Sequence, residues 1–249
     1  SGFGNAQVKG EGSGVSFDAA QETFTARYTH ETVALAFAIT EEAIEDNLYD
    51  RLAARYTKAL ARSMSNAKQV KAVEPLINGL PSTNTFKSGD GVSLFNTSHT
   101  TVAGSFKNTL TTQADLNETS LEQSMIDISK MTDERGLRIA ARGVKMIIPS
   151  ELQFTAERLM KSQGRTGTAD NDINAIVSMG MVPQGYRVNN YLTDSDAFYI
   201  ITDVPNGMKM FTRAPLTTAM EGDFDTGNVR YKARERYSFG VSDPRGIFG

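Results

Sequence analysis

Two histidines, His30 and His99, are the side chains of this sequence best suited to acid–base or metal chemistry. They lie far apart in the chain, and neither has a carboxylate or a second histidine at the spacing of metal ligands, which argues against a metal centre. No serine stands in a Gly-x-Ser-x-Gly elbow, so nucleophilic catalysis has no support either. We therefore predict no catalytic residue, cofactor or metal, and we expect His99 to form hydrogen bonds in a polar loop.

A second pattern that could do chemistry is a row of cations near the C-terminus, in NVRYKARERYSFGV (228–241). Odd positions are apolar except Glu235, and the even positions carry Arg230, Lys232, Arg234 and Arg236. On a strand these four side chains share one face at intervals of about 7 Å, and like charges so close require acidic partners. Those partners could be carboxylates of the same fold, carboxylates of a neighbouring subunit, or nucleic-acid phosphates. The even positions hold no aromatic residue, which weakens the base-stacking alternative.

The composition excludes several classes of protein. The 249 residues carry a net charge of -3, which disfavours a duplex-binding protein held by bulk positive charge. The absence of cysteine excludes disulfides and thiolate metal sites. No apolar run approaches the roughly 20 residues of a membrane span, so no membrane association is expected.

The element that must organise the rest is the segment 39–75, which we predict to be one long helix. Thr40 is a suitable N-cap, and acidic residues follow it at the positive end of the helix dipole. Pro75 is expected to end the helix. The apolar positions recur with helical period: Ile44, Leu48, Leu52, Tyr56, Leu60, Met64 and Val70.

Residues 1–39 ahead of this helix have the pattern of an extended arm. A glycine-rich start is followed by alternation of apolar and polar residues at 24–29 and, on the opposite parity, at 33–39. We expect two β-strands there, only half covered by their own chain. Such an arm packs on its own body or reaches a neighbour.

The remaining chain indicates an α+β fold without a regular βαβ repeat. Residues 76–115 are rich in Gly, Ser, Thr and Asn and are expected to be loop with short strands. Helices, strands and turns then alternate through 116–203. A turn at 204–207 is expected to join strands 198–202 and 208–213 in a hairpin.

The order of these parts resembles the major capsid proteins of tailed bacteriophages, whose fold is shared with encapsulin shells. The resemblance rests on four stretches that together cover nearly the whole chain: VALAFAITEEAIEDN (33–47), DGVSLFNTSHTTVAG (90–104), VKMIIPSELQFTAERLM (144–160) and VRYKARERYSFGVSDPRGIF (229–248). The second stretch is similar to relatives of the phage Mu head subunit. The resemblance implies the fold of a phage major capsid protein.

In this fold, residues 1–39 would be the N-terminal arm and extended β-loop. The peripheral domain would comprise 40–115 and 204–249, with a spine helix at 40–74, and the axial domain would comprise 116–203. Some relatives cross-link a lysine of the extended loop to an asparagine. Lys9 lies in the corresponding region, but no asparagine or acid is identified here, and the chemistry is not carried over.

The resemblance implies a structural, non-enzymatic subunit of an icosahedral phage head, assembled in the host cytoplasm and located in the virion. Its partners would be identical subunits in pentamers and hexamers, decoration, portal or scaffolding proteins, and packaged double-stranded DNA in non-specific contact. An encapsulin-type compartment and a nucleic-acid-binding protein using the basic strand are the alternatives. The candidate subunit contacts are Lys9, Glu11, Phe17, Phe24, Tyr28, Arg230, Lys232, Arg234 and Arg236.

Overall fold

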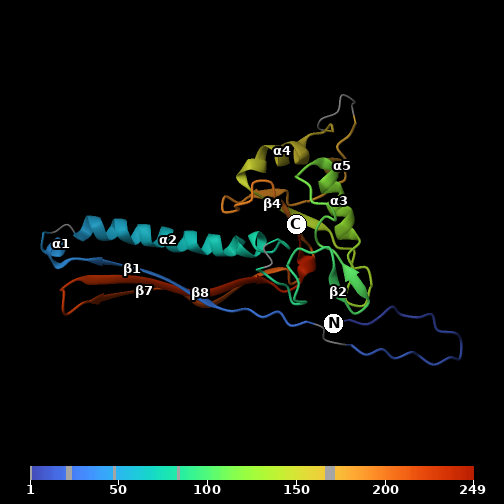
Figure 1. The fold of residues 1–249 in the computed structure, drawn as a ribbon, viewed down its shortest axis with the longest axis horizontal. Coiled ribbons are helices and arrows are strands. Elements are labelled where there is room, and N and C mark those ends of the chain that lie inside the picture. Colours follow the sequence, from blue (N-terminus) through green and yellow to red (C-terminus); the bar gives the residue numbers. More distant parts are fainter. Residues whose placement is uncertain (1, 21–23, 47–48, 83–84, 166–171) are drawn as a thin grey trace. The chain divides into compact units, whose positions relative to one another are not determined.

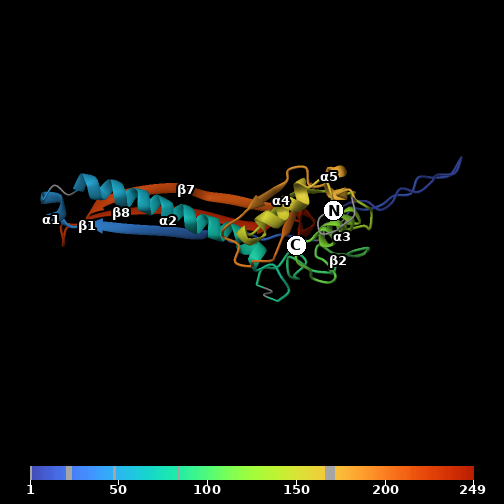
Figure 2. The same cartoon turned by 90° about the horizontal axis from the view of Figure 1, so that it is seen from above.

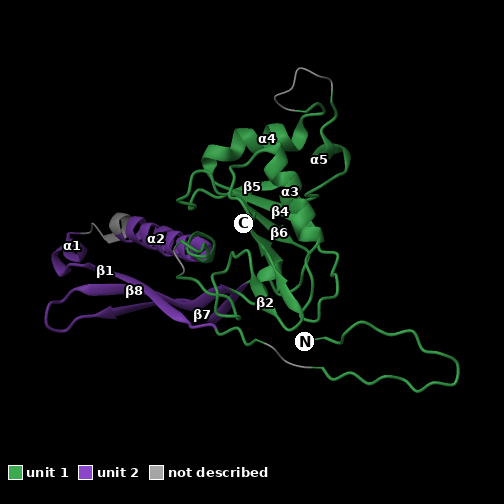
Figure 3. Ribbon diagram, turned by 45° about the vertical axis from the view of Figure 1, so that its right-hand side comes forward, with its two compact units in different colours: residues 1–27, 75–208, 241–249 green, residues 28–74, 209–240 purple. Residues whose placement is uncertain are grey.

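The computed structural model describes residues 2–20, 24–46, 49–82, 85–165 and 172–249 (Figure 1). Two compact units divide the chain. Unit 1 comprises residues 1–27, 75–208 and 241–249, and unit 2 comprises residues 28–74 and 209–240 (Figure 3). Each unit combines helices with an antiparallel or mixed sheet, in agreement with the predicted α+β class.

Unit 2 is built on a three-stranded antiparallel sheet in the order β1–β8–β7. Its strands are β1 (Glu31–Ile39), β8 (Val229–Val241) and β7 (Met208–Gly222). One long helix, α2 (Tyr49–Ile77), runs along this sheet (Figures 1 and 2). Leu60 and Met64 of the helix pack on Ala233 of β8, with Val33 and Phe37 of β1 beside them. The predicted alternation of β1 and β8 is therefore the means by which the sheet meets the helix.

The prediction of one continuous helix was wrong at its N-terminal end. A short helix, α1 (Glu41–Glu45), ends at Asp46, and α2 begins at Tyr49. Thr40 caps α1 as expected, accepting a hydrogen bond from the Ala43 amide at 3.4 Å. Acidic pairs four residues apart and the weak helix former Asp46 disfavour continuation of α1 past Glu45.

The C-terminal end and the apolar stripe of the helix also need correction. Pro75 lies inside α2, which continues to Ile77. A proline forfeits one helical hydrogen bond, and the burial of Val73 and Leu76 on either side opposes that cost. Val70 is 47% exposed, because it lies six residues after Met64 and therefore off the buried face. Of the other predicted stripe residues, Tyr56 is 44% exposed, while Leu48 and the side chain of Leu52 lie outside the described residues.

The face of α2 that meets the sheet continues instead through Lys68, which lies four residues, or about one helical turn, after Met64. Its ammonium contacts the Glu235 carboxylate at 2.9 Å. The Glu235 side chain is 5% exposed and the Lys68 side chain 33%. Glu235, the one charged residue among the apolar positions of β8, is thus accounted for by a cation on the covering helix.

Replacing Lys68 by methionine is expected to lower the free energy of unfolding by about 3 kcal/mol, because it leaves the Glu235 carboxylate buried without its partner. The matched change Lys71→Met is expected to cost only about 0.5 kcal/mol, since Lys71 pairs with the exposed Glu31 and Glu74. Urea denaturation of the two variants measures the difference. Equal losses would show that burial of Glu235 does not matter.

Unit 1 is centred on a four-stranded mixed sheet in the order β5–β4–β6–β9. β4 is parallel to β5 and antiparallel to β6, and β6 is antiparallel to β9. Helices α3 and α4 and this sheet share one apolar core, in which Leu121, Ile128, Met146 and Ile200 are fully buried. The elements of the unit are β2 (His99–Thr101), β3 (Gly104–Phe106), α3 (Glu118–Ser129), β4 (Gly143–Ile148), the 3-10 turn η1 (Ser150–Leu152), α4 (Gln153–Lys161), α5 (Ala175–Ser178), β5 (Tyr186–Val188), β6 (Tyr199–Thr202), the 3-10 turn η2 (Pro244–Gly246) and β9 (Ile247–Phe248).

The predicted hairpin between strands 198–202 and 208–213 is not formed. β6 pairs with β4 and β9, whereas β7 pairs with β8 in the other sheet. The turn that joins β7 to β8 is closed by a hydrogen bond from the Asp223 amide to the Asn228 carbonyl, at 2.8 Å, and Gly227 supplies the positive φ of 67° that it requires. The turn residues at 204–207 therefore mark a change of sheet.

Only the second of the two predicted N-terminal strands is present among the described residues. β1 covers 31–39, while residues 24–30 belong to no strand. The prediction of a strand at 24–29 was wrong, because alternation alone does not supply a partner strand for the segment to pair with.

Candidate functional site

The first candidate surface is the arm, defined here as residues 2–20. Its two extended limbs leave unit 1 and return to it (Figure 3). A turn at 10–13 joins them, and the Gly4 amide donates to Asp18 at 2.7 Å across the limbs. Nearly every residue of the arm is exposed, including the predicted contact residues Lys9, Glu11 and Phe17.

Several of the exposed side chains of the arm are apolar. Val8 is 101% exposed and Phe17 99%, and Val15 and Phe3 are 68% and 60% exposed. Asp18 ties the arm back to unit 1 through an ion pair with Arg135. The Gly4 amide and the Arg135 guanidinium hold the pKa of Asp18 below its usual range. The arm is thus anchored by polar contacts and leaves its apolar side chains uncovered, as expected of a surface that another chain covers.

Phe24 and Tyr28, also predicted as subunit contacts, follow the arm in the chain and lie in different surroundings. The Tyr28 ring packs edge-to-face on Phe211 of β7, with 4.7 Å between ring centroids. It also covers Gly240 of β8, where a Cβ atom would come within 2.6 Å of the ring. Phe24 is 49% exposed and lies beside Gly89. Tyr28 therefore serves the packing of its own chain.

The second candidate surface is the outer face of β8. All four predicted cations, Arg230, Lys232, Arg234 and Arg236, are exposed there. Arg230 pairs with Asp223, the nearest acid of the β7–β8 turn. For the other three cations, the ion pairs formed by the described residues provide no partner. The face that the sequence predicted is present, and pairing within the chain accounts for one of its four charges.

The neighbours of these cations on β1 are small and uncharged. Ala38 lies opposite Arg230, Ala36 opposite Lys232, and Ala34 opposite Arg234. On the other side, Thr217 of β7 donates to the Arg234 carbonyl at 3.2 Å. On the β1 side, therefore, the long cationic side chains stand beside small, uncharged residues.

His99 forms hydrogen bonds as predicted, but it lies on the short strand β2 rather than in a loop, and it is fully buried. Its Nδ1 is 2.7 Å from the Asp90 carboxylate and its Nε2 is 3.0 Å from Oδ1 of Asn108. Ser88 also donates to Asp90, so the serine and the histidine bind the same carboxylate rather than each other. This geometry does not activate a serine nucleophile, and the buried cluster is structural.

Sequence reasoning missed Asn108, which holds this cluster to the C-terminal segment. Its Nδ2 donates to the Leu94 carbonyl at 2.7 Å and to the Pro244 carbonyl at 3.0 Å, and its Oδ1 accepts from the Asn96 amide at 2.9 Å. No spacing rule connects a single asparagine with carbonyls more than 130 residues away. Only its position in a polar run, 96–108, could have drawn attention to it.

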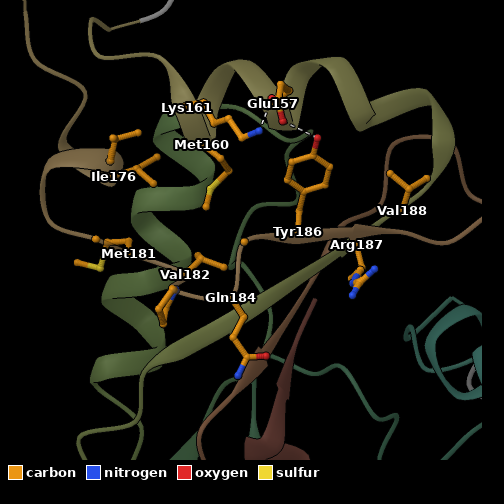
Figure 4. A pocket seen from close by; sticks show the side chains of 14 residues that line it. Glu157, Met160, Lys161, Ile176, Met181, Val182, Gln184, Tyr186, Arg187 and Val188 are labelled. Carbon is orange, nitrogen blue, oxygen red and sulfur yellow. Dashed lines mark hydrogen bonds and ion pairs between the residues drawn. The ribbon is translucent and has the colours of Figure 1, made fainter.

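A cavity of about 720 Å³ lies in unit 1 between α4, α5 and β5 (Figure 4). Glu157 accepts a hydrogen bond from the Tyr186 hydroxyl at 2.7 Å and pairs with Lys161 at 2.6 Å. Lys161 and Tyr186 lower the pKa of Glu157, and Glu157 raises the pKa values of both partners. Glu157 is therefore ionised and Tyr186 protonated near neutral pH, and this trio has no group poised to exchange protons there. Among the described residues, no three His, Asp or Glu side chains gather in a way that could hold a metal ion.

Replacing Glu157 by alanine is expected to lower the pKa of Tyr186 toward its ordinary value, because the hydrogen bond to the carboxylate is the main cause of the upward shift. An NMR titration with ring-labelled tyrosine measures this pKa. Glu151→Ala, which removes an exposed carboxylate near the start of α4, should leave it unchanged. An unaltered Tyr186 pKa in Glu157→Ala would contradict the contact in Figure 4.

Among the residues that the structure describes, no helix has the length and apolarity to cross a membrane.

A family model described as Phage capsid protein matches residues 22–248. No curated protein matches the sequence.

Solved structures share the fold at low sequence identity. The capsid of an empty GTA particle has a TM-score of 0.62 at 14% identity, over 100% of this chain and 80% of that chain. The capsid of the Myoviridae phage XM1 has a TM-score of 0.54 at 12% identity, over 98% and 81%. A structure of Gordonia phage Cozz has a TM-score of 0.51 at 15% identity, over 98% and 76%.

Proposed function

Since this chain belongs to the phage capsid protein family, whose model spans residues 22–248, we propose that it is the shell subunit of a phage head and that its arm binds a neighbouring copy. Its role as a structural capsid protein follows from the family, and its fold is that of capsid subunits. The finer proposal is that identical copies form pentamers and hexamers of an icosahedral shell around double-stranded DNA.

The observation that carries the proposal is the uncovered arm. The side chains of Val8 and Phe17 have no cover in a single chain. Burying an apolar side chain of this size contributes about 1.5–3 kcal/mol, so a neighbour that covered both would gain appreciable binding energy. One such contact is modest, but every subunit of a closed shell makes it, and the contacts act together.

We also propose the three-part organisation that the sequence suggested. The spine helix and the last strands would form the peripheral part, and the sheet around β4 would form the axial part. The compact unit of residues 28–74 and 209–240 supports a peripheral part of this kind. Closeness to the Mu head subunit is proposed on the segment 90–104 alone.

Further partners remain proposals from the family. Decoration, portal and scaffolding proteins would contact the shell, and packaged DNA would touch its inner surface without sequence specificity. We propose location in the virion after assembly in the host cytoplasm.

The test is assembly of the purified protein at rising concentration. Sedimentation velocity and negative-stain electron microscopy are expected to show closed particles above a threshold concentration. A protein that remained monomeric at every concentration and salt condition, with its arm folded onto its own body, would contradict the proposed function.

A further inference from the structure

The outer face of β8 and the end of the same sheet carry opposite charges, and the ion pairs of the described residues use few of them. We call Lys232, Arg234 and Arg236 the cationic face. We call residues 40–46 and 221–228 the acidic tip. The tip contains seven carboxylates and no lysine or arginine: Glu41, Glu42, Glu45, Asp46, Glu221, Asp223 and Asp225.

The two parts of the acidic tip lie together. Glu41 packs against the β7–β8 turn so closely that a Cβ atom on Gly227 would clash with its carboxylate. Figures 1 and 2 both place α1 beside the end of β7 and β8. Glu42, Glu45 and Asp225 are exposed, and the ion pairs of the described residues do not include them. The tip is thus a concentrated negative surface.

Within one chain, the ion pairs of the described residues join the tip to the first cation of the row. Asp223 binds Arg230. Arg234 lies four residues further along the strand, about 13 Å away, and Arg236 about 20 Å away. Arg234 and Arg236 therefore lie beyond the reach of Asp223 in their own chain. Lys232, about 7 Å from Arg230, has no ion-pair partner among the described residues either.

The tip also has an apolar anchor. Phe224, between Asp223 and Asp225, is 101% exposed. The cationic face suits an aromatic ring, because Ala34 and Ala36 leave a flat floor and Arg234 offers a guanidinium for a cation–π contact. Exposed aromatic residues ringed by charge are typical anchors of interfaces.

We propose that the acidic tip of one subunit docks on the cationic face of a second copy, with Phe224 placed among Lys232, Arg234 and Arg236. The inference rests on the proposed assembly and names a second contact, separate from the arm. Each copy supplies both surfaces, so the contact is head-to-tail and can close into rings. Duplex DNA is a poorer occupant, because seven carboxylates at the end of the same sheet would repel its phosphates.

The test uses charge reversal in the full chain. The face variant carries Lys232→Glu, Arg234→Glu and Arg236→Glu, and the tip variant carries Glu42→Lys, Glu45→Lys and Asp225→Lys. Each is expected to raise the threshold concentration for assembly at least about ten-fold, and the chain with all six changes is expected to recover it, since every contact again joins opposite charges. Wild-type assembly is expected to weaken with added salt.

The matched control reverses three exposed cations on α2, with Arg55→Glu, Lys58→Glu and Arg62→Glu, and should assemble like wild type. Circular dichroism and melting curves confirm that each variant folds.

Face and tip variants that assemble normally, in an experiment where the wild type assembles, would overturn this contact and leave the proposed function intact. Six changes without recovery would overturn it as well. A face variant that forms normal particles but loses salt-dependent binding to a DNA fragment would assign the face to nucleic acid instead. Failure of the wild type itself to assemble would overturn both proposals.

Discussion

Removal of residues 1–20 is expected to abolish shell assembly while the melting temperature changes by about 2 °C or less. The side chains of this segment are almost all exposed, so their loss uncovers little of the body. The contact that joins the arm to unit 1 through a side chain is the exposed pair of Asp18 and Arg135. Assembly is expected to fail because the removed apolar side chains are those that a neighbour would cover.

The structure sets where the truncation must stop. Removal of residues 1–30 would also delete Tyr28, which packs on Phe211 and over Gly240. Tyr28→Ala is therefore expected to destabilise the fold, whereas Val8→Ser with Phe17→Ser should leave stability unchanged and weaken assembly. Melting curves and electron microscopy separate the two effects. Full-size particles from the 1–20 deletion would refute the role of the arm.

The second large effect is expected at Asn108, where alanine should lower the free energy of unfolding by about 4 kcal/mol. The side chain is fully buried and hydrogen-bonds to the Leu94 and Pro244 carbonyls, the Asn96 amide and His99. Alanine removes the amide and with it all of these hydrogen bonds at once. The former partners are then buried polar groups without a hydrogen bond. The C-terminal segment, which Asn108 joins to residues 94–99, should loosen first.

Denaturant titration measures this loss, with Asn190→Ala as the control at an exposed asparagine. Asn108→Asp is expected to be at least as damaging, because a carboxylate cannot donate to the two carbonyls and carries a buried charge. A loss below about 1 kcal/mol in Asn108→Ala would show that ordered water or a local rearrangement replaces the amide.

Features that depend on neighbouring residues of one helix or strand, such as alternation and capping, were predictable from the sequence. The strand alternation of β8 follows from a period of two residues, and the N-cap of α1 at Thr40 follows from the capping preference of threonine. Helix ends were less predictable. Pro75 was expected to stop α2, but packing on both sides of it outweighs one missing hydrogen bond.

Pairing between distant segments could not be deduced in the same way. The turn at 204–207 has the composition of a hairpin turn, yet β6 and β7 enter different sheets. Glu235 broke the apolar pattern of β8 for a reason that lay 167 residues earlier, at Lys68. The buried cluster of Asp90, His99 and Asn108 likewise joins residues whose spacing has no helical or strand period.

The residues by themselves determined which faces would be apolar or charged, because side-chain direction follows from the backbone period of a strand or helix. They also determined that the arm would be extended and that Arg230, Lys232, Arg234 and Arg236 would share a face. Only the tertiary structure decided which of these surfaces the chain covers for itself: Tyr28 is packed, Phe17 is not, and in the described part of the chain Arg230 is the one cation of its row with an acidic ion-pair partner. The physical reason is that covering a surface depends on which distant segment lies against it, and local sequence does not encode that choice.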